Sequence, residues 1–216
     1  MTRGITVIDT RQIDRLAIEL RGFEHEIVTA SYHAIKRALD SALTVTAREV
    51  SKVYNIKAAE VKLPKDATTA AIRNKIVNIR IKKPSMNDLS SSVEYKGRTL
   101  TFTHFGITPQ KKMLPTRVEQ PVKVKVMKTG GFKKLLANPK PFVFKFPTNV
   151  KFNVWHRTGR SFYQIEPIRT LSVPQMITNA EIQSKISQAI ETTFNTRLEH
   201  EILRSMTSSS RNVSRR

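Results

Sequence analysis

The spacing of hydrophobic residues in the first quarter of the chain predicts a long helix. Apolar residues recur at helical intervals from about Phe23 to Tyr54, and charged residues lie largely outside the face that they form. This face is rich in alanine, and small side chains let another helix approach closely. We therefore expect the helix to pack against one from the C-terminal end of the chain. A short strand over residues 5–8 and a capped helix that starts at Asp9 should come before it.

The C-terminal part of the chain predicts a second long helix. Apolar residues recur there every four positions, at Ile182, Ile186, Ile190, Phe194, Leu198 and Ile202. Because that spacing exceeds the helical repeat of about 3.6 residues, the apolar row winds around the helix and predicts a tilted crossing over its neighbour. Pro174 suits the first turn, where its missing N–H is not needed. The helix should end near Met206, before a polar, basic tail at 207–216.

In the middle of the chain, from about residue 71, the helical period gives way to alternation of apolar and polar residues. Strands are predicted at 77–82, at 93–95 with a return through 100–102, at 122–126 and at 142–146. The links between them resemble hairpins rather than helical crossovers, which favours antiparallel pairing. We therefore predict an α+β fold, in which an antiparallel β-sheet with a long hairpin packs against N-terminal helices and a long C-terminal helix.

The stretch from residue 150 to residue 176 is expected to anchor much of the chain. It contains the only tryptophan, and the alternating residues 150–157 predict a strand. A turn at 158–160, where glycine tolerates φ > 0, should lead to a return strand over 162–165. The candidate structural anchors of this stretch are Trp155, Arg157, Gly159 and Pro174.

Residues 106–140 are predicted to form a projecting basic hairpin on a single domain that spans residues 1–206. Four prolines and many lysines make this segment less regular than the strands around it. Loops of this length are unusual in compact domains and often bind partners. For residues 109–119, a disordered excursion is the alternative that the composition leaves open.

Positive charge is concentrated in the middle of the chain. The formal net charge is +21, and residues 61–150 carry 19 Lys and Arg against 4 Asp and Glu. A basic surface that is merely solvated is the simpler interpretation, but the segregation of charge favours an acidic or polyanionic partner. The candidate interface or DNA-facing residues are Lys111, Lys112, Lys123, Lys125, Lys128, Lys133, Lys134 and Lys140.

Residues suited to catalysis are sparse. The chain has no cysteine, and two Glu-His-Glu triplets, at 24–26 and 199–201, lack the second histidine that a helical metal motif needs. The remaining histidines, His33, His104 and His156, have no neighbour at ligand spacing and should pack or form hydrogen bonds. We therefore expect no enzyme activity, no metal and no cofactor. No apolar run approaches the length of a transmembrane helix, so no membrane partner is expected either.

Non-specific nucleic-acid binding is the main alternative function. Lysines between residues 123 and 140 could neutralise phosphates, while Phe132 and Phe142 could stack on bases. Lysine outnumbers arginine in this segment, however, and ammonium groups favour non-specific contacts over base reading. A basic scaffold or assembly protein is therefore the preferred class, with nucleic acid as a secondary contact.

Five segments carry the most distinctive sequence of the chain. They are 8–16 (IDTRQIDRL), 47–57 (AREVSKVYNIK), 154–160 (VWHRTGR), 165–168 (IEPI) and 171–176 (LSVPQM). In this order, and followed by a long charged helix, they resemble the minor tail protein Z family of tailed bacteriophages and prophages. The similarity covers nearly the whole chain, and its last third is the most specific part. The family commonly has Gly-Pro before Ser-Val-Pro-Gln-Met, where this chain has Thr-Leu.

The resemblance implies a structural virion protein that completes the phage tail and makes its upper end competent to join the head. It implies a homo-oligomer, a hexameric ring, that lies beside the tail terminator and the head–tail connector proteins. The tape measure protein or genomic DNA would occupy the lumen of that ring. The chain would be assembled in the host cytoplasm and would reside in the tail or neck region of the virion. The family has no catalytic residues to carry over.

Overall fold

The computed structural model describes residues 2–7, 24–62, 71–73, 76–111, 120–146, 151–161 and 164–213. These residues form two long helices, several short ones and three antiparallel sheets. The predicted α+β class is thereby confirmed. The helix expected from Asp9, and most of the excursion expected at 109–119, lie outside the described residues.

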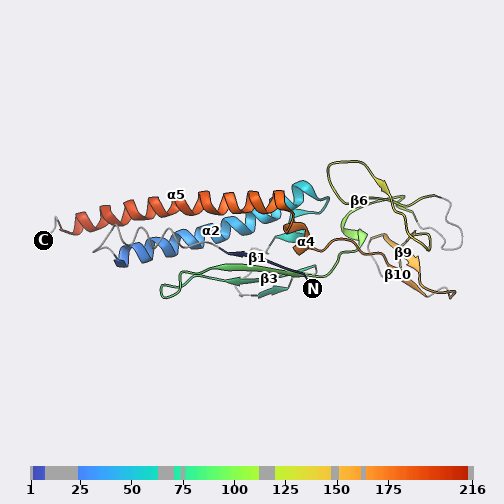
Figure 1. Cartoon of the computed structure of the whole chain (residues 1–216), viewed down its shortest axis with the longest axis horizontal. Coiled ribbons are helices and arrows are strands. Elements are labelled where there is room, and N and C mark those ends of the chain that lie inside the picture. The colour runs from blue at the N-terminus through green and yellow to red at the C-terminus, as the bar shows by residue number, and fades with distance from the viewer. Residues whose placement is uncertain are drawn as a thin grey trace.

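The two long helices, α2 (Glu24–Val53) and α5 (Ala180–Val213), run side by side in opposite directions along the molecule (Figure 1). Five residues of the stripe predicted on α5 are buried, and Ile202 is half-buried. The alanine-rich face of α2 is buried too, and Ser41 Oγ lies 3.2 Å from Thr193 Oγ1 between the helices. Burial of both apolar faces in one seam stabilises the pair. The predicted packing of the first helix against the last is confirmed.

A four-stranded sheet covers another side of α2 (Figure 1). In β3 (Val77–Lys82) and β4 (Ser92–Gly97), alternate residues such as Ile79 and Tyr95 are buried, whereas the residues between them are partly or fully exposed. Helix α2 is thus enclosed by α5 and by this sheet, which places the main core along α2. The strands, in spatial order, are β1 (Thr2–Val7), β4, β3 and β2 (Ala71–Arg73).

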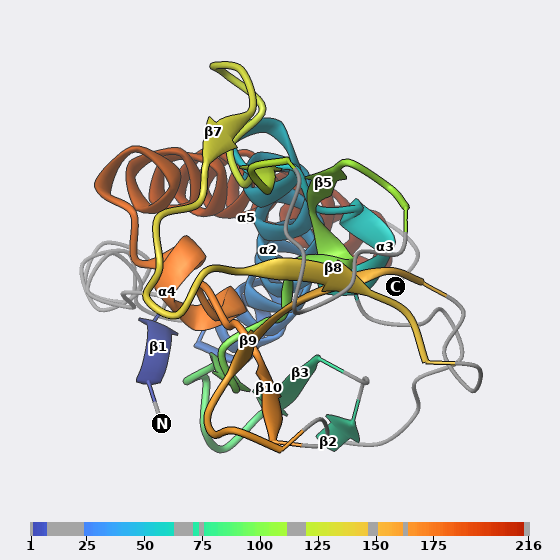
Figure 2. The ribbon, with the colours of Figure 1, turned by 90° about the vertical axis from the view of Figure 1, so that its right-hand side faces the viewer.

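Two three-stranded sheets form the end of the molecule opposite the C-terminus of α5 (Figures 1 and 2). The short helices α3 (Ala58–Val61) and η1 (Phe102–His104) lie where these sheets meet the end of α2. One sheet contains β5 (Gly106–Thr108), β6 (Lys123–Lys125) and β7 (Lys133–Lys134), and the other contains β8 (Phe142–Phe144), β9 (Asn153–Arg157) and β10 (Ile165–Pro167).

The short helix α4 (Val173–Ile177) begins with a capping box, because Ser172 Oγ accepts from the N–H of Gln175 and Gln175 Oε1 accepts from the N–H of Ser172. Pro174 occupies the first turn, as predicted, and is buried. Its Cδ would lie 3.1 Å from a Cβ built on Gly97, so the helix packs closely on the end of β4. This contact fixes the start of the C-terminal helical region on the sheet.

A single helix from Pro174 to Met206 was predicted; its start is confirmed, but its continuity and its C-terminal end are wrong. The chain leaves the helix at residues 178–179 and starts again with α5, which continues to Val213. The break occurs because Asn179 Oδ1 accepts a hydrogen bond from the N–H of Glu181, at 3.1 Å, and so provides a new N-terminal cap.

Two strand predictions also need correction. The return strand expected at 100–102 is absent, because the main chain of Leu100 bonds to Leu171 and Thr170 near α4 and the chain then enters the 3₁₀ helix η1. Of the strand expected at 162–165, residues 162–163 lie outside the described residues, and the described strand β10 begins at Ile165. Gly159 does not use a positive φ; among the described residues only Gly130 does.

Candidate interaction surface

Strands β5, β6 and β7, which lie within the segment predicted to form a projecting hairpin, run antiparallel across the end of the molecule as the meander β5–β6–β7. The meander is fastened to the C-terminal end of α2 by main-chain hydrogen bonds. The N–H of Asn55 donates to Val126 O at 2.7 Å, and the N–H of Lys128 donates to Val53 O at 2.8 Å. The side-chain amide of Asn55 also donates to Lys125 O at 3.2 Å. The long helix therefore sets the position of the meander.

The meander has an inner face that is buried and an outer face that is not. On the inner side, Ile107 pairs with Val124, and both are buried, as is Val122. Side chains alternate across a strand, so the neighbours of these residues project outward. We use the term outer face for Lys123, Lys125, Phe132, Lys134 and Leu136.

The outer face combines positive charge with exposed apolar surface. Lys123 and Lys134 are exposed and stand opposite each other across β6 and β7. Phe132 is 46% exposed and Leu136 is 81% exposed, and they flank Lys134 at a spacing of two residues. Single exposed apolar side chains are ordinary on a protein surface. Because Phe132 and Leu136 lie on one face and are rimmed by lysines, this face is a candidate interaction surface.

The other candidate lysines lie around the outer face without forming one cluster. Lys133 is exposed on the alternate side of β7, and Lys128 lies in the turn between β6 and β7. Lys111 and Lys140 are exposed in the segments that lead away from β5 and toward β8. Lys112 lies outside the described residues. The structure therefore brings together Lys123, Lys125 and Lys134 most closely, whereas the sequence offered no reason to separate them from the rest.

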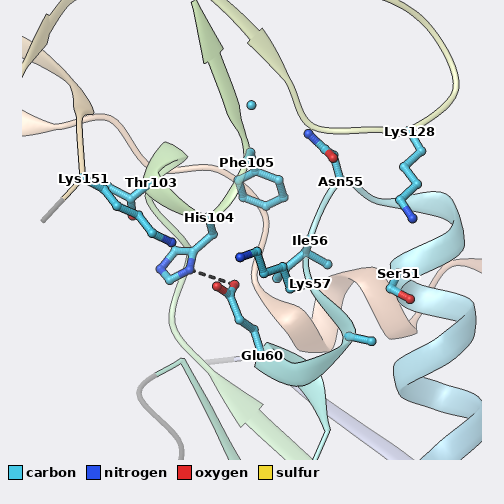
Figure 3. A pocket seen from close by; sticks show the side chains of 12 residues that line it. Ser51, Asn55, Ile56, Lys57, Glu60, Thr103, His104, Phe105, Lys128 and Lys151 are labelled. Carbon is cyan, nitrogen blue, oxygen red and sulfur yellow. Dashed lines mark hydrogen bonds and ion pairs between the residues drawn. The ribbon is translucent and has the colours of Figure 1, made fainter. Parts of the chain in front are cut away.

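A cleft of about 690 Å³ opens between the meander and the end of α2 (Figure 3). At its side, His104 Nδ1 lies 3.0 Å from Glu60 Oε2, and both side chains are partly exposed. The hydrogen-bonding role expected for His104 is confirmed. Three exposed lysines, Lys57, Lys128 and Lys151, reach the cleft from three separate segments. Because Glu60 and His104 are distant in sequence, no local pattern could have revealed this pair.

The anchors predicted between residues 150 and 176 lie apart from the outer face. Trp155 Nε1–H donates to Phe144 O at 3.1 Å and so joins β9 to β8. Arg157 Nη1 donates to Ser161 O at 3.2 Å and fastens the turn that follows β9. Gly159 leaves space for the side chain of Gln164, which a Cβ would overlap. These contacts, like that of Pro174, are internal to the fold.

Metal-ligating groups do not gather over the part of the chain that the structure describes, where no group of three or more His, Asp or Glu residues could hold an ion. The central histidines of the two Glu-His-Glu triplets, His25 and His200, are exposed on the long helices. Over the same residues, neither α2 nor α5 carries an apolar stretch of the length that crossing a bilayer requires.

Comparison of the chain with protein-family models, with curated proteins and with solved structures finds no match.

Proposed function

We propose that this protein is a structural virion component of a tailed bacteriophage, a tail completion protein that forms a ring at the head-proximal end of the tail and enables head–tail joining. The assignment to a phage tail rests on the resemblance of segments 154–160 and 171–176 to the minor tail protein Z family. The observation that supports an assembly role most strongly is the outer face, where Lys123 and Lys134 lie beside Phe132 and Leu136.

The chemistry of the outer face suits a protein neighbour. Apolar side chains at the centre of an interface contribute by leaving water, whereas lysines steer the encounter and reject partners of like charge. A chain with a net charge of +21 repels its own copies wherever basic surfaces meet, so the neighbour of the outer face is an acidic surface. In the proposed ring, that surface belongs to the tail terminator or to a head–tail connector protein.

The shape of the subunit also supports the proposal. The helix pair α2 and α5 extends toward one end of the molecule, and the meander lies at the other (Figure 1). An elongated subunit of this kind can contact a ring neighbour through one end while the other end meets a different ring. A hexameric arrangement follows from the family resemblance.

The mass of the purified protein, alone and after mixing with isolated phage tails, tests this function. Nuclease is added so that DNA cannot bridge the components. We expect either a discrete closed oligomer or stoichiometric retention on tail ends. A protein that stays monomeric and does not bind to tails would contradict the proposal.

Non-specific nucleic-acid binding is a second candidate, because Phe132 is an exposed aromatic ring on the same face as Lys125 and Lys134. Phosphate neutralisation makes such binding fall steeply as salt rises. If the same preparation ignores tails but binds single-stranded DNA of any sequence with that salt dependence, the second candidate replaces the first.

A further inference from the structure

Strand β7 leaves one side of its main chain without a strand partner among the described residues. It is the last strand of the order β5–β6–β7. The N–H of Leu135 donates to Val122 O at 2.8 Å, so the main-chain groups of Leu135 point toward β6. Hydrogen-bonding groups alternate in direction along an antiparallel strand. Those of Lys134, in the two-residue strand β7, therefore point away from β6. We call this side of β7, together with the flanking residues Phe132 and Leu136, the β7 edge.

An open edge is a template for another strand, and its side chains decide which strand is accepted. Lysine on an edge discourages pairing with a second copy of the same basic chain, because like charges directly opposite each other are destabilising. The β7 edge carries Lys134 between Phe132 and Leu136, which are both substantially exposed. The charge pattern therefore selects a strand with an acidic residue between apolar ones.

We propose that the β7 edge binds an extended acidic segment of a neighbouring protein by β-strand addition, with an Asp or Glu opposite Lys134 and apolar side chains opposite Phe132 and Leu136. The inference rests on the proposed function, which supplies an acidic protein neighbour, and it specifies how that neighbour is held. Main-chain hydrogen bonds supply affinity, and the alternating side chains supply specificity.

A protein strand fits this edge better than a nucleic acid does. The edge offers main-chain N–H donors and C=O acceptors in alternation, and an extended peptide offers the complementary set. Phosphate groups accept hydrogen bonds from the donors but leave the carbonyl oxygens without partners. The exposed side chain of Leu136 also gains by burial under an apolar residue, which a phosphate backbone does not provide.

Two variants at one position separate charge from main-chain hydrogen bonding. Lys134→Ala removes the ammonium group and keeps the N–H, whereas Lys134→Pro removes both. Because the N–H of Lys134 points away from β6, proline there spares the bonds of the meander, and proline is tolerated on edge strands. Circular dichroism and a denaturation curve confirm that both variants fold. The probe is a synthetic peptide in which valine, glutamate and leucine alternate with threonine. A control peptide has the same sequence but is N-methylated on the amides that would face the β7 edge.

We expect the peptide to bind the wild-type protein and to bind Lys134→Ala more weakly. Lys134→Pro should bind about fivefold more weakly than Lys134→Ala, because one hydrogen bond contributes about 1 kcal/mol. N-methylation should abolish binding. Equal binding by the two variants, or by the two peptides, would show attraction by charge alone and would overturn the inference, as would no binding to the wild-type protein.

Phage tails distinguish this inference from the function on which it rests. If the wild-type protein is retained on tails but the peptide result fails, the tail function stands and strand addition does not. If the peptide binds through the edge but tails are ignored, the edge is a strand acceptor for a different acidic protein and the tail function fails.

Discussion

Phe132 packs over Gly106: a Cβ built on Gly106 would lie 3.3 Å from Cε1 of the Phe132 ring. The two residues belong to the two outer strands of the meander, since Gly106 starts β5 and Phe132 immediately precedes β7. The missing side chain at Gly106 therefore lets the ring lie across the sheet, where one of its sides packs and about half of it remains exposed. This contact holds an aromatic group in place on the outer face before any partner arrives.

Replacement of Gly106 by alanine should destabilise the protein by about 1 kcal/mol, because the added Cβ overpacks a tight site. It would lie 3.1 Å from Asn55 Nδ2, on the side chain that bonds to Lys125 O. Urea denaturation measures the change. Gly131→Ala is the matched control, since a Cβ there has no atom within 4 Å. Equal stability of the two variants would contradict the tight packing of Phe132 and Asn55 around Gly106.

Tyr95 should make the stability of the protein depend on alkaline pH. Burial raises the pKa of the Tyr95 phenol from 10.0 to about 12, although its hydrogen bond with Thr46 acts in the other direction. Between those pH values the unfolded chain ionises this group and the folded chain does not, so the free energy of unfolding falls as pH rises. The fall attributable to Tyr95 is about 3 kcal/mol, at about 1.4 kcal/mol per pKa unit.

Denaturation curves of the wild-type protein and Tyr95→Phe, at pH 9 and above pH 11, isolate this contribution. The difference between the two proteins should favour the wild type at the lower pH and reverse or vanish at the higher one. Tyr32→Phe, at a half-buried position on α2, is the control for general alkaline effects. A difference between wild type and Tyr95→Phe that does not change with pH would show that the phenol is not held neutral by the fold.

The seam between α2 and α5 should respond strongly to truncation of its apolar side chains. Phe194 is 3% exposed, and its replacement by alanine should cost about 3–5 kcal/mol, because the cavity cannot close fully. Leu203→Ala, on the same helix but 66% exposed, should change stability by less than about 0.5 kcal/mol. Thermal or chemical denaturation compares the two variants. A small effect at Phe194 would contradict the role of the seam as the main core.

The elements that the sequence predicted well are those in which the burial of one face produces a regular spacing of apolar residues. The stripe on α5 and the alternation around Ile79 and Tyr95 are two such patterns, and both faces are buried as expected. In β8, by contrast, Phe142, Val143 and Phe144 are all buried. The alternation of phenylalanines therefore predicted the strand, but it did not show that both faces of the strand are buried.

The parts that could not be predicted depend on residues far apart in the chain. Leu100 joins the segment before α4 instead of returning along β4, because its main chain bonds to Leu171 and Thr170. Lys123 and Lys134 became neighbours only through the register of β6 and β7. The break at Asn179 did carry a local signal, since asparagine is a favoured N-cap, and the periodic apolar row on either side concealed it.

Retention on tails after charge reversal tests whether the outer face joins this protein to its neighbour. The double variant Lys123→Glu/Lys134→Glu alters the outer face, and Lys36→Glu/Arg197→Glu alters exposed residues of the helix pair by the same net charge. Both are mixed with isolated tails at moderate salt, with nuclease present, and the bound protein is quantified. We predict that the outer-face variant loses at least tenfold in retention, about 1.4 kcal/mol, and that the helix-pair variant binds as the wild type does. Equal retention of the two variants, or loss of both in parallel, would contradict the outer face as the surface that joins this protein to its neighbour.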